Sequence, residues 1–131
     1  MINRSDGGER SLPLGKLPPD VLESVLTRCA VASADVIVPA RLGEDAAVLK
    51  IGRRLIAVGT DPITFPTPRP GFFAVHINAN DIAVTGAAPQ FYLLTLLVPA
   101  GTTVGEIHGM MDGAVEAGKS VGAALVGGRT E

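Results

Sequence analysis

Residues 43–61, GEDAAVLKIGRRLIAVGTD, decide the fold because they contain two short apolar runs separated by a two-residue turn. Residues 46–51 and 55–58 are largely apolar and bounded by turn residues, which is typical of β-strands. The dipeptide Gly52-Arg53 lies between the turn-proximal ends of the two runs. A tight hairpin of antiparallel strands is therefore expected here.

Carboxylates flank this predicted hairpin at its open end. Folding about the turn places Asp45 opposite or nearly opposite Thr60, with Asp61 one step further along the chain. Mutual repulsion makes such a group costly unless a positive charge lies between its members, and a divalent cation would provide one. Mg²⁺ prefers a few carboxylate oxygens together with waters and phosphates, so the pattern favours a Mg-nucleotide site over a closed protein cage. The alternative is that Asp45 and Asp61 each only cap a turn.

The rest of the chain predicts a mixed α+β domain rather than a run of βαβ units. Residues 1–12 have no periodicity and are expected to form a flexible tail, so the domain spans residues 13–131. Helices are expected at residues 20–29, 71–85 and 104–119, and strands at 36–38, 46–51, 55–58, 91–98 and 123–126. The strand at 91–98 is apolar throughout and is predicted to be fully buried. Four glycines in the last helix predict close packing against a neighbour.

The second helix carries an unusual polar run, His76-x-Asn78-x-Asn80-Asp81. Asn and Asp in a helix interior cost helix propensity, so they call for a reason. A single solvent-facing stripe explains Asn78 with Asp81, or His76 with Asn80, but hardly both. A histidine at a position such as His76 is more often a hydrogen-bonded packing residue than a metal ligand. We expect His108 at the surface.

Gly127 and Gly128 follow the last apolar run, at a point where backbone amides can approach a phosphate closely. The alternative is an ordinary turn at the end of a strand. Neither a Walker A loop nor a dinucleotide-binding fingerprint occurs in the right setting, which excludes the P-loop and Rossmann interpretations.

Composition narrows the possible partners and the cell compartment. The net charge is −2 and no cluster of basic residues has aromatic neighbours, so nucleic acid is not expected to bind. The longest apolar stretch, residues 91–100, is too short to span a membrane, and the polar amino terminus predicts a cytoplasmic protein without a secretory signal. Cys29 falls on the apolar stripe of the first helix and is expected to be buried. An apolar content of 47% against 18% charged residues predicts that some apolar surface is interface.

Four segments in the same order resemble the aminoimidazole ribonucleotide (AIR) synthetase superfamily: GEDAAV at 43–48, TDPIT at 60–64, NDIAVTGAAP at 80–89 and GGRTE at 127–131. Members use ATP. The resemblance implies an α+β amino-terminal domain with a four-stranded, mostly antiparallel sheet and helices on one face. It also implies a homodimer in which two such sheets pair into a barrel, with nucleotide near the interface.

Carried over by position, the resemblance implies the cofactors Mg²⁺ and ATP. The implied metal ligands are Asp45, Asp61 and Asp81. The implied nucleotide-binding residues are Asn80, Thr60, Gly127 and Gly128. No catalytic residue is assigned.

Gly-Gly-Arg-Thr-Glu is most similar to the hydrogenase-maturation branch, the carbamoyl dehydratases, where His usually stands in place of Arg129. This implies an enzyme that activates a carboxamide oxygen by phosphorylation. The family's carboxy-terminal domain is not encoded in these 131 residues, so this chain alone is not expected to turn over, and a second domain or a maturation partner is expected. The alternatives are a non-catalytic dimerising or nucleotide-sensing module, a thiamine-monophosphate kinase-like fragment, and a small phosphotransferase complete in itself.

Overall fold

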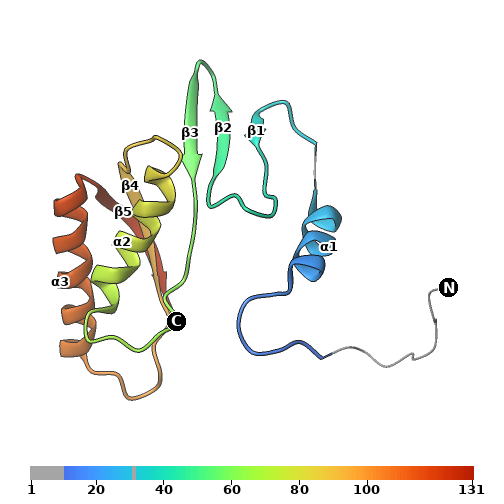
Figure 1. Ribbon diagram of the computed structural model, residues 1–131. Coiled ribbons are helices and arrows are strands. Elements are labelled where there is room, and N and C mark those ends of the chain that lie inside the picture. Colours follow the sequence, from blue (N-terminus) through green and yellow to red (C-terminus); the bar gives the residue numbers. More distant parts are fainter. Residues whose placement is uncertain (1–10, 31) are drawn as a thin grey trace.

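The computed structural model describes residues 11–30 and 32–131, so most of the tail predicted at residues 1–12 lies outside the described residues. Eight elements follow one another along these described residues (Figure 1). They are α1 (Pro19–Cys29), β1 (Val36–Val38), β2 (Ala47–Ile51), β3 (Arg54–Val58), α2 (Pro70–Ala83), β4 (Phe91–Leu96), α3 (Val104–Val121) and β5 (Ala124–Thr130). The predicted helices and strands are all present, and their ends differ by no more than two residues except in β5, which runs four residues beyond the predicted end at 126.

The first three strands form one antiparallel sheet in the order β1-β2-β3. In β2 and β3, Ala47 pairs with Val58 and Ile51 pairs with Arg54, which confirms the predicted hairpin. Gly52 turns the chain with a φ of 61°, a left-handed conformation that glycine adopts without steric cost. In Figure 1 β1 and β2 lie apart from the helices α2 and α3, and the hairpin of β2 and β3 rises beyond them.

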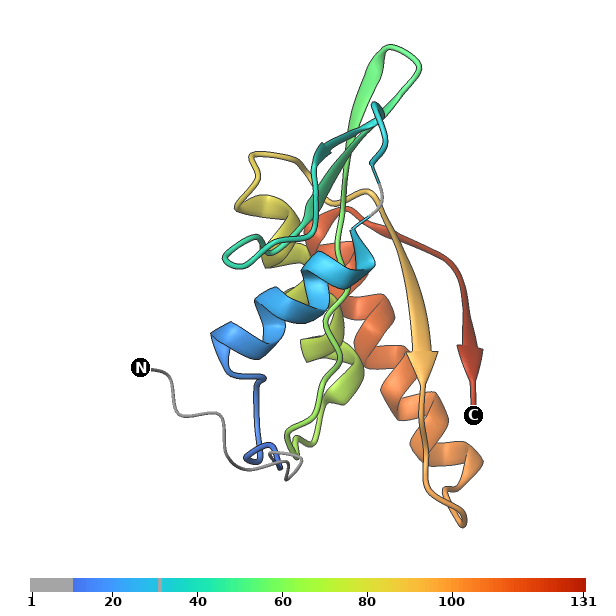
Figure 2. The ribbon, with the colours of Figure 1, turned by 90° about the vertical axis from the view of Figure 1, so that its right-hand side faces the viewer.

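The second part of the fold is a helical pair packed on a small parallel sheet. α2 and α3 lie side by side on one face of β4 and β5 (Figure 2). Val75 of α2 and Ala114 and Ala117 of α3 form the centre of the core. Partly buried side chains pack against this centre from α2, β4 and α3, namely Phe72, Tyr92, Leu94 and Val121.

The expected single four-stranded sheet is not what the described residues form; their strands make a three-stranded sheet and a separate two-stranded one. β5 pairs with β4 in parallel, so β4-α3-β5 is a βαβ unit. The physical reason is the length of α3, which carries the chain back along the sheet before β5 begins. β5 also continues through Gly127 and Gly128, so this glycine pair lies inside the strand instead of after it.

Glycines let α2 and α3 approach more closely than side chains would permit. A Cβ at Gly71 would lie 1.9 Å from the Met110 carbonyl oxygen, and one at Gly113 would lie 3.1 Å from the Phe72 amide nitrogen. At Gly118, a Cβ would lie 2.8 Å from the Tyr92 hydroxyl. The close packing predicted for the last helix is therefore confirmed.

Two burial predictions are wrong. β4 is not fully buried, because only one of its faces meets the helices, and Phe91 and Leu93 on the other face are 69% and 72% exposed. Cys29 is exposed because α1 packs extensively against no other described element. Among the described helices, none is both long and apolar enough to cross a membrane.

α3 begins with a capping box. The Thr103 hydroxyl accepts a hydrogen bond from the Glu106 amide at 3.3 Å, and the Thr103 amide donates to Glu106 Oε2 at 2.7 Å. Hydrogen bonds from the backbone and side chain of Thr103 lower the pKa of the Glu106 carboxyl. Because the folded-state pKa is depressed, this carboxylate stabilises the fold above its unfolded-state pKa, and the contribution is lost as the pH falls through the folded-state value.

The Thr103→Ala variant is expected to lose about 1 kcal/mol of unfolding free energy at neutral pH, because an amide in the first turn of α3 loses its acceptor. Urea denaturation at neutral and acidic pH measures this, and the loss should shrink in acid, where the reciprocal bond from Glu106 is already weakened. Thr103→Ser keeps the hydroxyl and should behave like the parent chain. Equal losses in the two variants would contradict the capping role.

Candidate carboxylate site

The segment that follows β3 is fixed to α2 by one side chain. Asn78 donates from Nδ2 to the Asp61 carbonyl at 2.8 Å, and its Oδ1 accepts from the Asp61 amide at 2.7 Å. Nδ2 also donates to the Ala74 carbonyl within α2 at 2.9 Å. This pairing explains the cost of an asparagine in the helix interior. It also fixes the backbone that carries the Asp61 carboxylate.

Asp45 reaches the same region through the hairpin. Continuing the β2-β3 register two residues beyond Ala47 and Val58 places Asp45 opposite Thr60, as predicted. A Cβ at Gly59 would lie 3.3 Å from the Asp45 carbonyl oxygen and 3.7 Å from Cδ1 of Ile82. The end of the hairpin and the second half of α2 therefore meet where Asp45, Asp61 and Asp81 are located.

Asp81 responds to the other two carboxylates. Partial burial is the main cause of its raised pKa, and the negative charges of Asp45 and Asp61 raise it further, while Lys16 acts in the opposite direction. Asp45 and Asp61 are exposed, whereas Asp81 is partly buried. The three predicted metal ligands thus form one electrostatic cluster.

The cluster is not a closed metal cage. Within the described part of the chain, no three His, Cys, Asp or Glu side chains lie close enough to hold one ion between them. A cation at this site would need further ligands from outside the chain, such as water or phosphate oxygens. Thr60 and Asn80 directly precede Asp61 and Asp81 in the sequence, and both residues are exposed to solvent.

Gly127 and Gly128 lie elsewhere, along a separate cavity of about 420 Å³. Its lining consists of Leu94, Leu96, Met111, Leu125 and residues 127–130, and it includes none of the three carboxylates. A Cβ at Gly128 would lie 1.9 Å from the Leu94 carbonyl oxygen, so packing within the sheet already requires glycine there. Arg129 forms an ion pair with Glu131.

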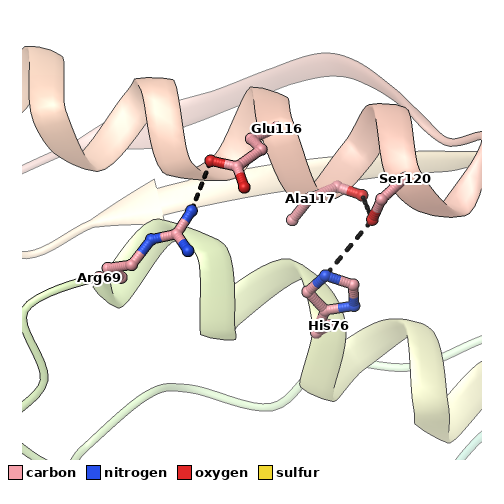
Figure 3. Close-up of polar contacts among 5 residues, drawn as sticks. All are labelled: Arg69, His76, Glu116, Ala117 and Ser120. Carbon is pink, nitrogen blue, oxygen red and sulfur yellow. Dashed lines mark hydrogen bonds and ion pairs between the residues drawn. The ribbon is translucent and has the colours of Figure 1, made fainter.

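His76 belongs to the contact between the two long helices. Its Nε2 lies 3.4 Å from the Ser120 hydroxyl, and Figure 3 shows the imidazole directed toward α3. On the same side, Arg69 forms an ion pair with Glu116 (Figure 3). These contacts support the packing interpretation of His76. His108 is exposed, as predicted.

Asn78 was not among the predicted site residues, although its place in the polar run was the available signal. Asn78→Ala is expected to lower the unfolding free energy by about 2 kcal/mol, because two hydrogen bonds to the Asp61 backbone are lost. Thermal and urea denaturation measure the change. The matched variant Asn80→Ala, at an exposed position two residues away, should change stability little. Similar losses in both variants would argue against the role assigned to Asn78.

Comparison with known proteins places this chain in a family. Residues 43–131 match the AIR synthase related protein, N-terminal domain. Thiamine-monophosphate kinase of Bacillus subtilis is 42% identical over 60 residues, covering 46% of this chain and 18% of that protein. A protein described as a hydrogenase expression/formation protein, from Methanocaldococcus jannaschii, is 27% identical over 123 residues, covering 89% of this chain and 37% of that protein.

Solved structures agree on the fold. AaThiL complexed with AMPPCP and TMP has a TM-score of 0.66 and 19% identity, covering 86% of this chain and 35% of that one. Thiamine monophosphate kinase from Aquifex aeolicus has a TM-score of 0.63 and 17% identity, covering 86% and 37% respectively. The chain therefore spans less than two fifths of the length of each of these relatives. It belongs to the AIR synthase related proteins and contains their N-terminal domain.

Proposed function

We propose that this chain is the Mg-ATP-binding domain of an ATP-dependent enzyme. Mg²⁺ would bind among Asp45, Asp61 and Asp81 with the nucleotide phosphates, and because the three carboxylates do not converge on one point, some of them would reach the ion through water. The observation that carries the proposal is that the hairpin end at Asp45 and the segment at Asp61 both meet α2 beside Asp81. The charges of Asp45 and Asp61 act on Asp81 there. The three carboxylates repel one another, and a cation between them would relieve this repulsion. Because they do not form a closed metal cage, the cation would bind together with the phosphates of a nucleotide.

The residues present fit such a group. Carboxylate oxygens are the ligands that Mg²⁺ prefers, and the bound ion would neutralise charge on the phosphates. Asn78 holds the Asp61 backbone in place, and the exposed Thr60 and Asn80 supply further polar groups beside the cluster. A nucleotide-binding role for Gly127 and Gly128 is supported by the motif alone, since their cavity is separate from the carboxylates.

For the reaction, the proposal is a hydrogenase-maturation type of enzyme, in which a carboxamide oxygen is activated by phosphorylation. The similarity that extends over 89% of this chain supports this branch. One residue also favours it over a kinase-like fragment, which the resemblance implies would use an Asp pair at positions 44 and 45. Position 44 is Glu in this chain, and its carboxylate forms an ion pair with Arg41.

A thiamine-monophosphate kinase-like fragment is the second candidate, supported by 42% identity over 60 residues and by the solved structures. Titration with thiamine monophosphate in the presence of a non-hydrolysable ATP analogue separates the two. Saturable binding of thiamine monophosphate would favour the kinase-like candidate. A nucleotide-sensing module without catalysis is the alternative if the protein binds nucleotide but transfers no phosphoryl group.

We also propose that the chain acts as a homodimer. Large apolar side chains lie exposed on the face of the β4-β5 sheet away from the helices, as at Phe91, Leu93 and Val126. Pairing of two such faces would cover them. A second domain or a maturation partner would be a further occupant of this surface.

Calorimetric titration of the chain with a non-hydrolysable ATP analogue, with and without Mg²⁺, tests nucleotide binding directly. The expected result is saturable binding that depends on Mg²⁺. Sedimentation of the same sample reports whether it is dimeric. A folded dimer that binds no nucleotide at millimolar concentrations would contradict the proposal for this domain.

A further inference from the structure

The tip of the β2-β3 hairpin concentrates positive charge. Lys50, Arg53 and Arg54 fall within five consecutive residues around the turn at Gly52, and all are exposed. We call the segment 50–55 the hairpin tip. The hairpin extends beyond the helices in both ribbon views (Figures 1 and 2). This places the three cations at the most prominent end of the hairpin.

Apolar side chains lie across the hairpin from two of these cations. Lys50 pairs across the hairpin with Leu55, and Ile51 pairs with Arg54. Cross-strand partners project from the same face of a hairpin, so each face of the tip carries one cation beside one aliphatic side chain. Ile51 and Leu55 are 59% and 65% exposed. The tip is therefore a mixed cationic and apolar surface.

The three cations, Lys50, Arg53 and Arg54, form no ion pairs with acidic side chains in the described part of the chain. Asp35 is close by, since its carbonyl accepts a hydrogen bond from the Lys50 amide at 2.7 Å, but it offers one carboxylate to three cations. Outside the tip, eight Lys and Arg residues face thirteen Asp and Glu residues, a net charge of −5. The molecule is thus polarised, with a positive tip on an acidic remainder.

We propose that the hairpin tip is a docking site for another polypeptide, which presents carboxylates interspersed with apolar side chains. Arginine forks bind carboxylates in two-pronged geometry, and complementary charge steers association. An anionic lipid surface fits less well, because recognition of such surfaces uses clusters of about four to eight cations. The dense negative charge of a nucleic acid or lipid surface would also repel the acidic remainder of the chain. A few carboxylates on a protein partner would interact mainly with the nearby cations of the tip, because salt screens their charge at longer distances. The proposal does not depend on nucleotide binding.

A fluorescein-labelled, acetylated peptide of alternating Glu and Leu residues is the probe, titrated with the whole chain at low ionic strength. The first variant is Arg53→Gln with Arg54→Gln. The matched control, Arg28→Gln with Lys119→Gln, removes the same charge from exposed positions elsewhere. We expect the peptide affinity to fall about tenfold in the tip variant and less than about twofold in the control. Circular dichroism checks that both variants fold.

Three outcomes would overturn the proposal. The first is an equal loss in both variants, which would mean that net charge alone attracts the peptide. The second is no measurable peptide binding by the parent chain. The third is tighter binding to phosphatidylserine-containing vesicles or to a single-stranded oligonucleotide than to the peptide, with the same dependence on the tip. A peptide in which Gln replaces Glu should bind weakly to every form of the chain.

Discussion

The Gly71→Ala variant is expected to lose about 3 kcal/mol or more of unfolding free energy, because the added carbon atom would collide with the backbone of α3. The added Cβ would lie 1.9 Å from the Met110 carbonyl oxygen and 3.0 Å from the Ala114 amide nitrogen. Both are backbone atoms of a long helix, which cannot rotate away as a side chain can. Relief requires α2 and α3 to separate, and this would open the core around Ala114.

Gly109 provides the matched control, since it lies in α3 and a Cβ there would meet nothing within 4 Å. Gly109→Ala is expected to raise stability by about 0.5–1 kcal/mol, because glycine inside a helix is entropically unfavourable. Urea denaturation and thermal unfolding measure both variants. A loss below about 1 kcal/mol for Gly71→Ala would show that the helices can readjust at little cost.

Removing two of the three carboxylates should have the largest functional effect. The double variant Asp45→Asn with Asp81→Asn is expected to weaken Mg²⁺-dependent binding of a non-hydrolysable ATP analogue by at least about a hundredfold, or about 2.8 kcal/mol. Amide groups retain the size and polarity of the side chains but carry no charge to offset that of Mg²⁺. Calorimetric titration of the parent chain and the variant measures the difference.

The stability of that variant distinguishes a lost site from a lost fold. Burial and two neighbouring charges raise the pKa of Asp81, so folding disfavours its charged form. This group therefore favours the fold most at low pH, and the contribution is lost as the pH rises through the folded-state pKa. At neutral pH without Mg²⁺, the variant should melt no lower than the parent chain.

A charge-matched control keeps the interpretation specific. Asp35→Asn with Asp112→Asn removes two exposed carboxylates outside the cluster. Nucleotide binding by this control should stay within about twofold of the parent chain, since screened surface charges act weakly at a distance. If both double variants lost binding to the same extent, the assignment of Asp45 and Asp81 as metal ligands would be wrong.

Local sequence signals predicted the elements that depend on local chemistry. The turn between two apolar runs predicted the β2-β3 hairpin, and extending its register beyond Ala47 and Val58 leads to Asp45 opposite Thr60. The apolar periodicity around Val75, with a stop at Gly86 and Pro89, predicted α2. Convergence of the three carboxylates followed from the hairpin together with the resemblance to a known family.

What the sequence did not predict depends on long-range packing. A continuous apolar run such as residues 91–96 can form a strand that is covered on one face or on both. The sequence pattern does not distinguish the two cases, so the exposure of Phe91 was not predicted. The burial of Cys29 was wrong because an amphipathic pattern does not say whether a partner is present in the same chain. The parallel pairing of β5 depends on the path of α3, and the link from Asn78 to Asp61 depends on tertiary contact across 17 residues.

The link between Asn78 and Asp61 has a mechanical consequence. The three-stranded sheet makes no extensive contact with α2, α3, β4 or β5, so residues 59–61 act as the joint between two parts of the molecule. Asp45 belongs to the sheet side of this joint and Asp81 to the helical side. Any rotation about the joint changes the distance between these two carboxylates, so a ligand that bridges them would also lock the angle between the two parts.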